Sequence, residues 1–170
     1  MGKEILIPRD KILRRVKELA DEISLDYTGK EPILVGILKG SVFFYADLVR
    51  EIKIPVKLDF IRAFSYGAET CSSGSVKFTK TVELPVRDKD IIIVEDIVDT
   101  GLTLSKIREM LMDEGARSFR ICALIDKPER RERAVSIDYC GFEVPEGFIV
   151  GYGLDYDEKY RNLPEIYLLK

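Results

Sequence analysis

Residues 91–104, with the sequence Ile-Ile-Ile-Val-Glu-Asp-Ile-Val-Asp-Thr-Gly-Leu-Thr-Leu, constrain the fold of this chain more than any other segment. Four apolar residues with high β propensity predict a buried strand, which runs directly into the adjacent carboxylates Glu95 and Asp96. In an open α/β sheet, ligands bind beyond the carboxyl ends of strands, where the N–H groups that begin the next helix attract an anion. This segment therefore predicts an α/β sheet with an anion-binding site at a strand end.

The turn after this strand suits a phosphorylated sugar. Thr100 and Thr103 offer hydroxyl donors, Gly101 allows close approach of the backbone, and the carboxylate pair can accept hydrogen bonds from sugar hydroxyls. An ordinary helix start with Asp99 and Thr100 as capping residues explains the same turn, but it leaves the adjacent carboxylates without a role. No G-x-x-x-x-G-K-[ST] loop is present, and Gly151-Tyr152-Gly153 lacks the third glycine of a dinucleotide site. A sugar-phosphate site is the favoured interpretation.

Composition narrows the chemistry of this site. The 170 residues fit one domain, and a formal charge of −3 with 27 dispersed basic residues argues against a nucleic-acid surface. Because the chain has no histidine, proton transfer falls to carboxylates, lysines or tyrosines, and a metal would meet oxygen ligands, as magnesium prefers. Three scattered cysteines predict neither a zinc cluster nor a disulfide framework. Without a signal peptide or a transmembrane run, we expect a cytoplasmic protein that does not bind membranes.

Apolar periodicity predicts the order of the elements. Asp10 is the expected cap of a first helix that Gly29 ends. Strands are predicted at 33–38, 56–64, 91–94, 118–125, 135–139, 148–152 and 166–169, with one helix that runs through Val49 and another that Gly115 ends. The alternation predicts a mainly parallel sheet with helices on both faces over about residues 30–127, and residues 128–170 with part of the N-terminus as a hood over its carboxyl end. The polar run 65–75 predicts a mobile loop over the site.

Residues 91–104 closely resemble the phosphoribosyl pyrophosphate signature of the phosphoribosyltransferases. Further segments resemble the purine members of this family in the same order, at residues 35–40, 65–67, 124–128 and 147–164. The resemblance implies the type I phosphoribosyltransferase fold in one domain over residues 1–170. It also implies transfer of a 5-phosphoribosyl group from phosphoribosyl pyrophosphate to N9 of the 6-oxopurine hypoxanthine, and of guanine, with Mg²⁺ in a homodimer or homotetramer.

The resemblance also assigns roles to residues. The ribose hydroxyls would be held by Glu95 and Asp96. The 5′-phosphate would be bound by Asp99, Thr100, Gly101, Leu102 and Thr103. Asp99 would also act as general acid and base at N7 of the purine. Leu102 stands where some members carry lysine, so a cation is missing there. Pyrophosphate would be contacted by Lys39, Gly40 and Arg161, with a cis peptide before Gly40.

The remaining roles concern the base, the metal and a closing loop. The purine would be bound by Lys127, Phe148, Ile149 and Asp155, with Lys127 donating to the 6-oxo group and Phe148 stacking on the ring. Magnesium would be held by Asp155, Glu95 and Asp96. Ser65 and Tyr66 would belong to a flexible loop that closes over the pyrophosphate and shields the reaction from water.

Two other classes of protein share part of this pattern. A transcriptional regulator on the same fold would keep the phosphate loop and would add a basic surface for RNA or DNA. A receiver-type signalling domain also places acidic residues at strand ends, but it does not need the Thr-Gly-x-Thr turn. Lys127, Phe148 and Asp155 favour the enzyme, because a regulator has no need of base-recognition residues.

Overall fold

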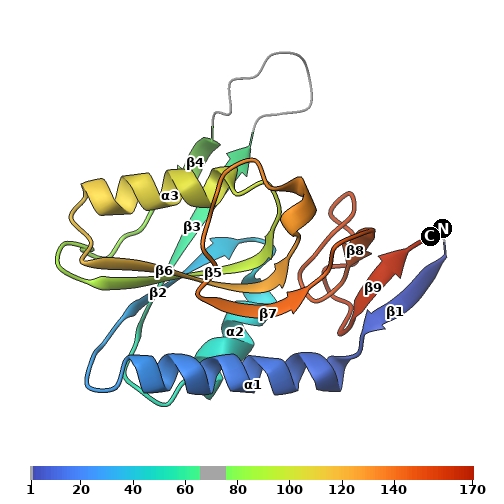
Figure 1. Ribbon diagram of the computed structural model, residues 1–170, viewed down its shortest axis with the longest axis horizontal. Helices are drawn as coiled ribbons and strands as arrows, with labels where there is room; N and C mark the ends of the chain where they lie inside the picture. The colour runs from blue at the N-terminus through green and yellow to red at the C-terminus, as the bar shows by residue number, and fades with distance from the viewer. Residues whose placement is uncertain (1, 66–75) are drawn as a thin grey trace.

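The computed structural model of the protein describes residues 2–65 and 76–170, with Ser65 described by its backbone only. The main strands are β2 (Ile33–Leu38), β3 (Lys57–Ser65), β4 (Val76–Lys80), β5 (Asp90–Val98), β6 (Ser118–Asp126) and β7 (Tyr139–Glu143). They form one sheet in the order β4-β3-β2-β5-β6-β7, in which β4 alone is antiparallel to its neighbour. The helices α1 (Arg9–Asp26) and α2 (Val42–Glu51) cover one face, and α3 (Leu102–Asp113) covers the other (Figure 1). The predicted α/β class with a mainly parallel sheet is confirmed.

β5 lies in the middle of this sheet and packs on both faces. Ile91 and Ile93 belong to the core under α3, whereas Ile92 and Val94 belong to the core under α1 and α2. All four side chains are fully buried. Because each such side chain contributes about 1.5–3 kcal/mol of burial free energy, this strand is firmly fixed between the two layers. It is the rigid support of the site that follows it.

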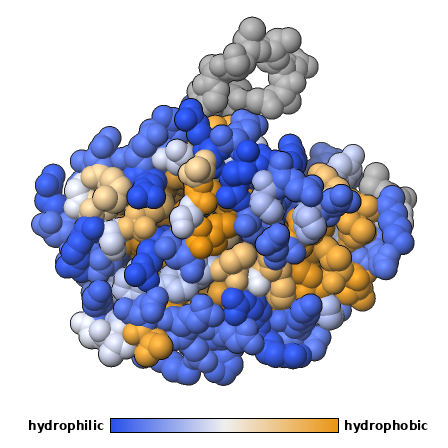
Figure 2. All heavy atoms as spheres, viewed as in Figure 1, coloured by the Kyte–Doolittle hydropathy of each residue, from blue (hydrophilic) through white to orange (hydrophobic). Residues whose placement is uncertain are grey.

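A second sheet is built from both ends of the chain. Its strands are β1 (Lys3–Ile7), β8 (Phe148–Val150) and β9 (Ile166–Leu169), in the order β1-β9-β8 and all antiparallel. Figure 1 shows this sheet beyond the carboxyl ends of the parallel strands, with the two termini side by side. In Figure 2, hydrophilic residues cover most of the visible face, and apolar residues gather on the side of the small sheet. No helix within the described ranges is long and apolar enough to span a membrane.

The predictions for the start of α1 and for the strand at 135–139 were wrong. Asp10 does not cap α1: it lies in the first turn and pairs with Arg14 at 3.1 Å, while Pro8 is the capping residue and its carbonyl accepts from Ile12 N–H. The strand expected at 135–139 instead begins at Tyr139, because its position is set by parallel pairing with β6. The central sheet therefore continues beyond residue 127. The short helix η1 (Pro128–Arg130) connects β6 to this part of the chain.

Candidate active site

The two adjacent carboxylates lie within β5 and not after it. The predicted strand was too short, because pairing with β6 continues from Glu95 opposite Ala123 to Val98 opposite Asp126. Successive side chains of a strand point to opposite faces, so Glu95 faces the α3 side and Asp96 the α2 side. Their exposed fractions are 8% and 9%. The strand thus holds two acidic groups in fixed directions near the carboxyl edge of the sheet.

Among the residues that the structure describes, Glu95 and Asp96 have backbone donors and no cation as partner. Glu95 Oε1 accepts from Asp96 N–H at 3.0 Å, and Asp96 Oδ1 accepts from Ile97 N–H at 2.9 Å. Neither carboxylate forms an ion pair with any residue of the described chain. Burial, reinforced by the neighbouring Asp96 carboxylate, raises the pKa of Glu95 well above its usual range. Such a pair is ready to accept hydrogen bonds from the hydroxyls of a ligand.

Gly40 lies against the acidic pair because it has no side chain. A Cβ atom at Gly40 would overlap the Asp96 carboxylate, and one at Gly153 would overlap the carbonyl oxygen of Gly40. Gly153 has a φ of 103°, which other residues rarely adopt. The expected cis peptide is present in this loop, but between Leu38 and Lys39, one bond before the predicted position. Three segments distant in sequence therefore meet here, with the Gly40 backbone between the Asp96 carboxylate and the Gly153 backbone.

The phosphate-binding turn predicted at residues 99–103 connects β5 to α3. The capping residue of α3 is Gly101, with a φ of 82°, and not Asp99 or Thr100. The left-handed backbone at this position explains why a glycine stands there. Thr100 Oγ1 accepts from Leu102 N–H at 3.4 Å. The N–H groups at the start of α3 thus lie beside the end of β5, in the arrangement that binds anions.

Asp99 lies at the edge of this turn, with one oxygen engaged and one free. Asp99 Oδ2 is 3.0 Å from a guanidinium nitrogen of Arg130, whose side chain is 69% exposed. Asp99 Oδ1 is buried and has no hydrogen-bond partner among the residues described. A buried acceptor without a donor is uncommon in folded proteins. It therefore marks a position where a ligand can donate.

Lys39 and Arg161 are brought together by Glu158. One oxygen of Glu158 is 2.7 Å from Lys39 Nζ, and the other is 3.1 Å from a guanidinium nitrogen of Arg161. Both contacts lower the pKa of Glu158, with that of Lys39 the larger. Arg161 also donates to the Gly153 carbonyl at 2.7 Å and pairs with Asp155 at 3.0 Å, while its buried Nε has no partner within the described structure. Two of the three predicted pyrophosphate ligands, Lys39 and Arg161, are thus neighbours bridged by a carboxylate.

Three of the four predicted base-binding residues, Lys127, Phe148 and Ile149, lie at or beside the start of β8. Lys127 Nζ donates to the Gly147 carbonyl at 2.6 Å. Phe148 is 52% exposed, and its ring forms a T-shaped pair with that of Tyr156 at a centroid distance of 5.4 Å. Ile149 points the other way, with a side chain that is 5% exposed and packed in the core, because neighbouring residues of a strand alternate in direction. Only the backbone of Ile149 is therefore available to a base.

The carboxylate of Asp155 is already engaged on both oxygens, by Arg161 and by the Glu158 N–H at 2.9 Å. Residues 2–65 and 76–170 contain no group of three or more carboxylate, cysteine or histidine side chains placed to hold a metal ion. A magnesium ion in this site would therefore take one or two carboxylates and complete its shell with ligand oxygens and water, as magnesium commonly does. The Ser65 side chain and Tyr66, predicted to form a closing loop, lie outside the described residues.

Three site residues had no role in the sequence interpretation. They are Glu158, Arg130 and Arg131. Glu158 lies inside a segment that resembles the family, and a left-handed φ of 59° places it opposite Lys39, which is 119 residues away in sequence. The arginines belong to the charged run 129–133, whose position directly after Lys127 was the one available signal.

The fold and the site define the class of this protein. A family model for the phosphoribosyl transferase domain matches residues 4–157. The chain belongs to this family. The predicted type I phosphoribosyltransferase fold is confirmed by solved structures of this family that superpose on it.

Among its relatives, the chain is 45% identical over 168 residues to the hypoxanthine-guanine phosphoribosyltransferase of Bacillus subtilis, covering 99% of this chain and 93% of that protein. It is 45% identical over 165 residues to the hypoxanthine phosphoribosyltransferase of Escherichia coli, covering 96% and 93%. A crystal structure of a hypoxanthine-guanine phosphoribosyltransferase from Bacillus anthracis has a TM-score of 0.94 with 44% identity and covers 98% of both chains.

Proposed function

We propose that this chain transfers the 5-phosphoribosyl group of phosphoribosyl pyrophosphate to N9 of hypoxanthine, and of guanine, releasing pyrophosphate. The observation that carries the proposal is a pair of buried polar atoms without partners. Within the described structure these atoms are Asp99 Oδ1, an acceptor, and Arg161 Nε, a donor. The reaction needs an acceptor beside the purine and a donor beside the diphosphate, and these residues are the ones that the family resemblance assigns to those places.

The acidic pair is proposed to hold the sugar. Displacement of pyrophosphate develops positive charge at C1 of the ribose, so groups that fix the 2′- and 3′-hydroxyls also place negative charge near the reacting carbon. Glu95 and Asp96 suit this role because β5 holds both side chains rigidly and no cation of residues 2–65 and 76–170 pairs with them. The N–H groups and hydroxyls of residues 99–103 would bind the 5′-phosphate, as helix N-termini bind anions.

The diphosphate is proposed to bind between Lys39, the Gly40 backbone and Arg161. The forked guanidinium of Arg161 suits phosphate oxygens, and its free Nε adds a donor. When the diphosphate binds, it would replace Glu158 as the ion-pair partner of Lys39 and Arg161. Asp155, with Glu95 and Asp96, would provide oxygen ligands for magnesium, which neutralises the leaving diphosphate when bound.

The base is proposed to bind over Phe148, with Lys127 at its 6-oxo group. An aromatic face is worth roughly 1–3 kcal/mol to a stacked base in nucleic-acid proteins, and half of the Phe148 surface is free for this. Lys127 already donates to a carbonyl oxygen, so a 6-oxo group offers it the same kind of partner. Asp99 would take the purine proton at N7 on its free oxygen.

An assay of four purines with phosphoribosyl pyrophosphate tests this function. Hypoxanthine and guanine should give the nucleoside monophosphates in a reaction that requires magnesium and stops with EDTA. The assay also shows whether xanthine is a substrate, and adenine is expected to give no product. A protein that turns over none of them, but binds RNA or DNA, would be a regulator of the same fold.

The proposal extends to assembly and location. A homodimer or homotetramer is supported by exposed apolar residues at the start of α2, where Val42 and Phe43 are 37% and 42% accessible. A cytoplasmic location is supported by Cys122 and Cys140, which are both free thiols. Light scattering of the purified protein would give the subunit number, and fractionation of cells would give the location.

A further inference from the structure

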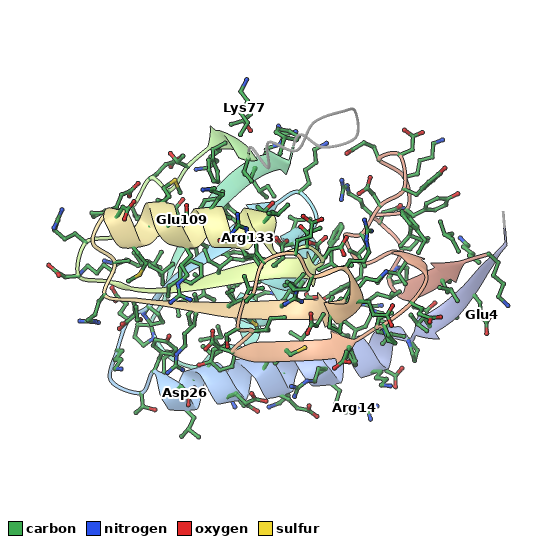
Figure 3. All side chains as sticks on the ribbon, turned by 45° about the horizontal axis from the view of Figure 1, so that its top comes forward. Glu4, Arg14, Asp26, Lys77, Glu109 and Arg133 are labelled. Atoms are coloured by element: carbon green, nitrogen blue, oxygen red, sulfur yellow. The ribbon has the colours of Figure 1, made fainter. Side chains whose placement is uncertain are left out.

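The segment that follows β6 covers the outer side of the phosphate-binding turn. Three successive carbonyl oxygens, of the last residue of β5 and the first two residues of that turn, accept hydrogen bonds from this segment. The pairs are Val98 O with Lys127 N at 2.9 Å, Asp99 O with Arg131 Nε at 3.0 Å, and Thr100 O with Glu132 N at 2.9 Å and Arg133 N at 3.0 Å. Figure 3 labels Arg133 beside the first turn of α3. The backbone carbonyls from Val98 to Thr100 are therefore all held from one side.

Arg131 is the one side chain in this set of donors, and further contacts restrain its guanidinium. Its guanidinium also pairs with Asp126, at the carboxyl end of β6, and donates to the Val135 carbonyl at 3.4 Å. Only 18% of the side chain is exposed. The planar fork of arginine makes such a set of bonds in a fixed geometry, which the single nitrogen of lysine does not. Arg131 thus ties the Asp99 carbonyl to the end of a sheet strand.

Fixing these carbonyls also fixes the N–H groups of the turn. A trans peptide unit is planar, and its C=O and N–H point in opposite directions. Because the carbonyls of Asp99 and Thr100 point to the covering segment, the N–H groups of Thr100 and Gly101 point away from it. Neither N–H has an acceptor among the described parts of the chain. These donors are oriented before any anion arrives.

We propose that Arg131 is a positioning residue for the 5′-phosphate: it holds the Asp99–Thr100 peptide so that the N–H groups of the turn face the ligand. This inference rests on the proposed function, since it takes residues 99–103 as the phosphate site. Arg131 does not itself touch the ligand. Arg130 next to it has a different place, because its exposed guanidinium contacts the Asp99 carboxylate and leaves the backbone of the turn free.

Two variants distinguish the effect of the planar set of donors of Arg131 from the effect of its positive charge. Arg131→Lys keeps the charge and loses the planar set of donors, whereas Arg131→Met keeps much of the apolar stem and loses both. Arg133→Met is the matched control, because Arg133 is exposed and contributes only its backbone N–H to the turn. Each folded variant is titrated by calorimetry with ribose 5-phosphate, which reports the turn, and with magnesium pyrophosphate, which reports Lys39 and Arg161.

Both Arg131 variants should weaken ribose 5-phosphate binding by about tenfold or more, the scale of one charge-assisted hydrogen bond, with pyrophosphate affinity within about twofold of the unaltered protein. Arg133→Met should leave the affinities for ribose 5-phosphate and for magnesium pyrophosphate unchanged. Unchanged ribose 5-phosphate affinity in the Arg131 variants would refute the inference and leave the proposed function standing. A fall in thermal stability with equal losses for both ligands would also refute it, because it would mark a purely structural role. If the unaltered protein binds pyrophosphate but no ribose 5-phosphate, the proposed phosphate site fails and the inference fails with it.

Discussion

Replacing Glu95 by glutamine should remove a pH-dependent loss of stability. Burial and the adjacent Asp96 raise the pKa of Glu95 above its value of 4.5 in an unfolded chain. Between these two pKa values, the native state binds more protons than the unfolded state. Protonated Glu95 therefore adds to the free energy of unfolding, and this addition is complete below about pH 4.5. It is lost as the pH rises through the pKa of Glu95 in the folded protein, at up to about 1.4 kcal/mol per pH unit. Glutamine cannot ionise, so Glu95→Gln avoids this loss.

The structure makes glutamine a mild replacement. Its carbonyl oxygen can keep the hydrogen bond that Glu95 Oε1 accepts from Asp96 N–H, and its volume is nearly the same. Urea unfolding of both proteins in EDTA, from about pH 5 to about pH 9, gives the free energy of unfolding at each pH. The free energy of unfolding of Glu95→Gln should increase relative to that of the unaltered protein as the pH rises. The exposed Glu146 supplies a control, Glu146→Gln, whose curve should stay parallel to that of the unaltered protein. Parallel curves for Glu95→Gln as well would refute the argument.

Three further predictions concern the proposed reaction. Asp99→Ala should lower the turnover number by roughly 10²–10⁴-fold, the usual loss of a general acid or base, and near-normal turnover would remove Asp99 from that role. Lys127 has donors only, so it opposes the 6-amino group of adenine, and the unaltered protein should prefer hypoxanthine by roughly 10⁴–10⁵ in kcat/KM. Comparable kcat/KM values for the two bases would contradict the 6-oxopurine assignment. Glu158→Gln should tighten magnesium pyrophosphate binding by about threefold, because an uncharged amide competes less for Lys39 and Arg161. Asp157→Asn makes the same change of charge one residue away on an exposed side chain, and an equal effect there would exclude a specific role for Glu158.

The parts of the fold that could be predicted from sequence are those that local pattern decides. Ile33–Leu38 and Ile166–Leu169 were placed at their observed bounds, because apolar runs between glycine, proline and polar residues leave few alternatives. β5 was predicted four residues too short at its carboxyl end, because two adjacent carboxylates are unusual within a strand. Pairing with β6 decides this boundary, and no local pattern reveals it. β7 was misplaced for the same reason.

In the site, too, local sequence pattern predicts some features and long-range contacts decide the others. The turn at residues 99–103 is contiguous in sequence, so its residues could be identified together. The bridge from Lys39 to Glu158 and the clamp of Arg131 on the Asp99 carbonyl depend on contacts 119 and 32 residues apart in sequence. The prediction that Ile149 contacts the purine did not specify backbone or side chain, because the direction of alternation in β8 is fixed only when the strand packs on the core.

The small sheet has a consequence for how the protein is made. β9 is its middle strand, so β1, which begins at Lys3, has no partner in this sheet until Leu169 has been synthesised. β8 has the same requirement, since Phe148 pairs with Leu169. On the ribosome, the central sheet can therefore form first, with the turn proposed to bind phosphate in place, while the proposed aromatic platform for the base still lacks its support. The order of synthesis thus places the proposed base site among the last parts of the fold that a growing chain completes.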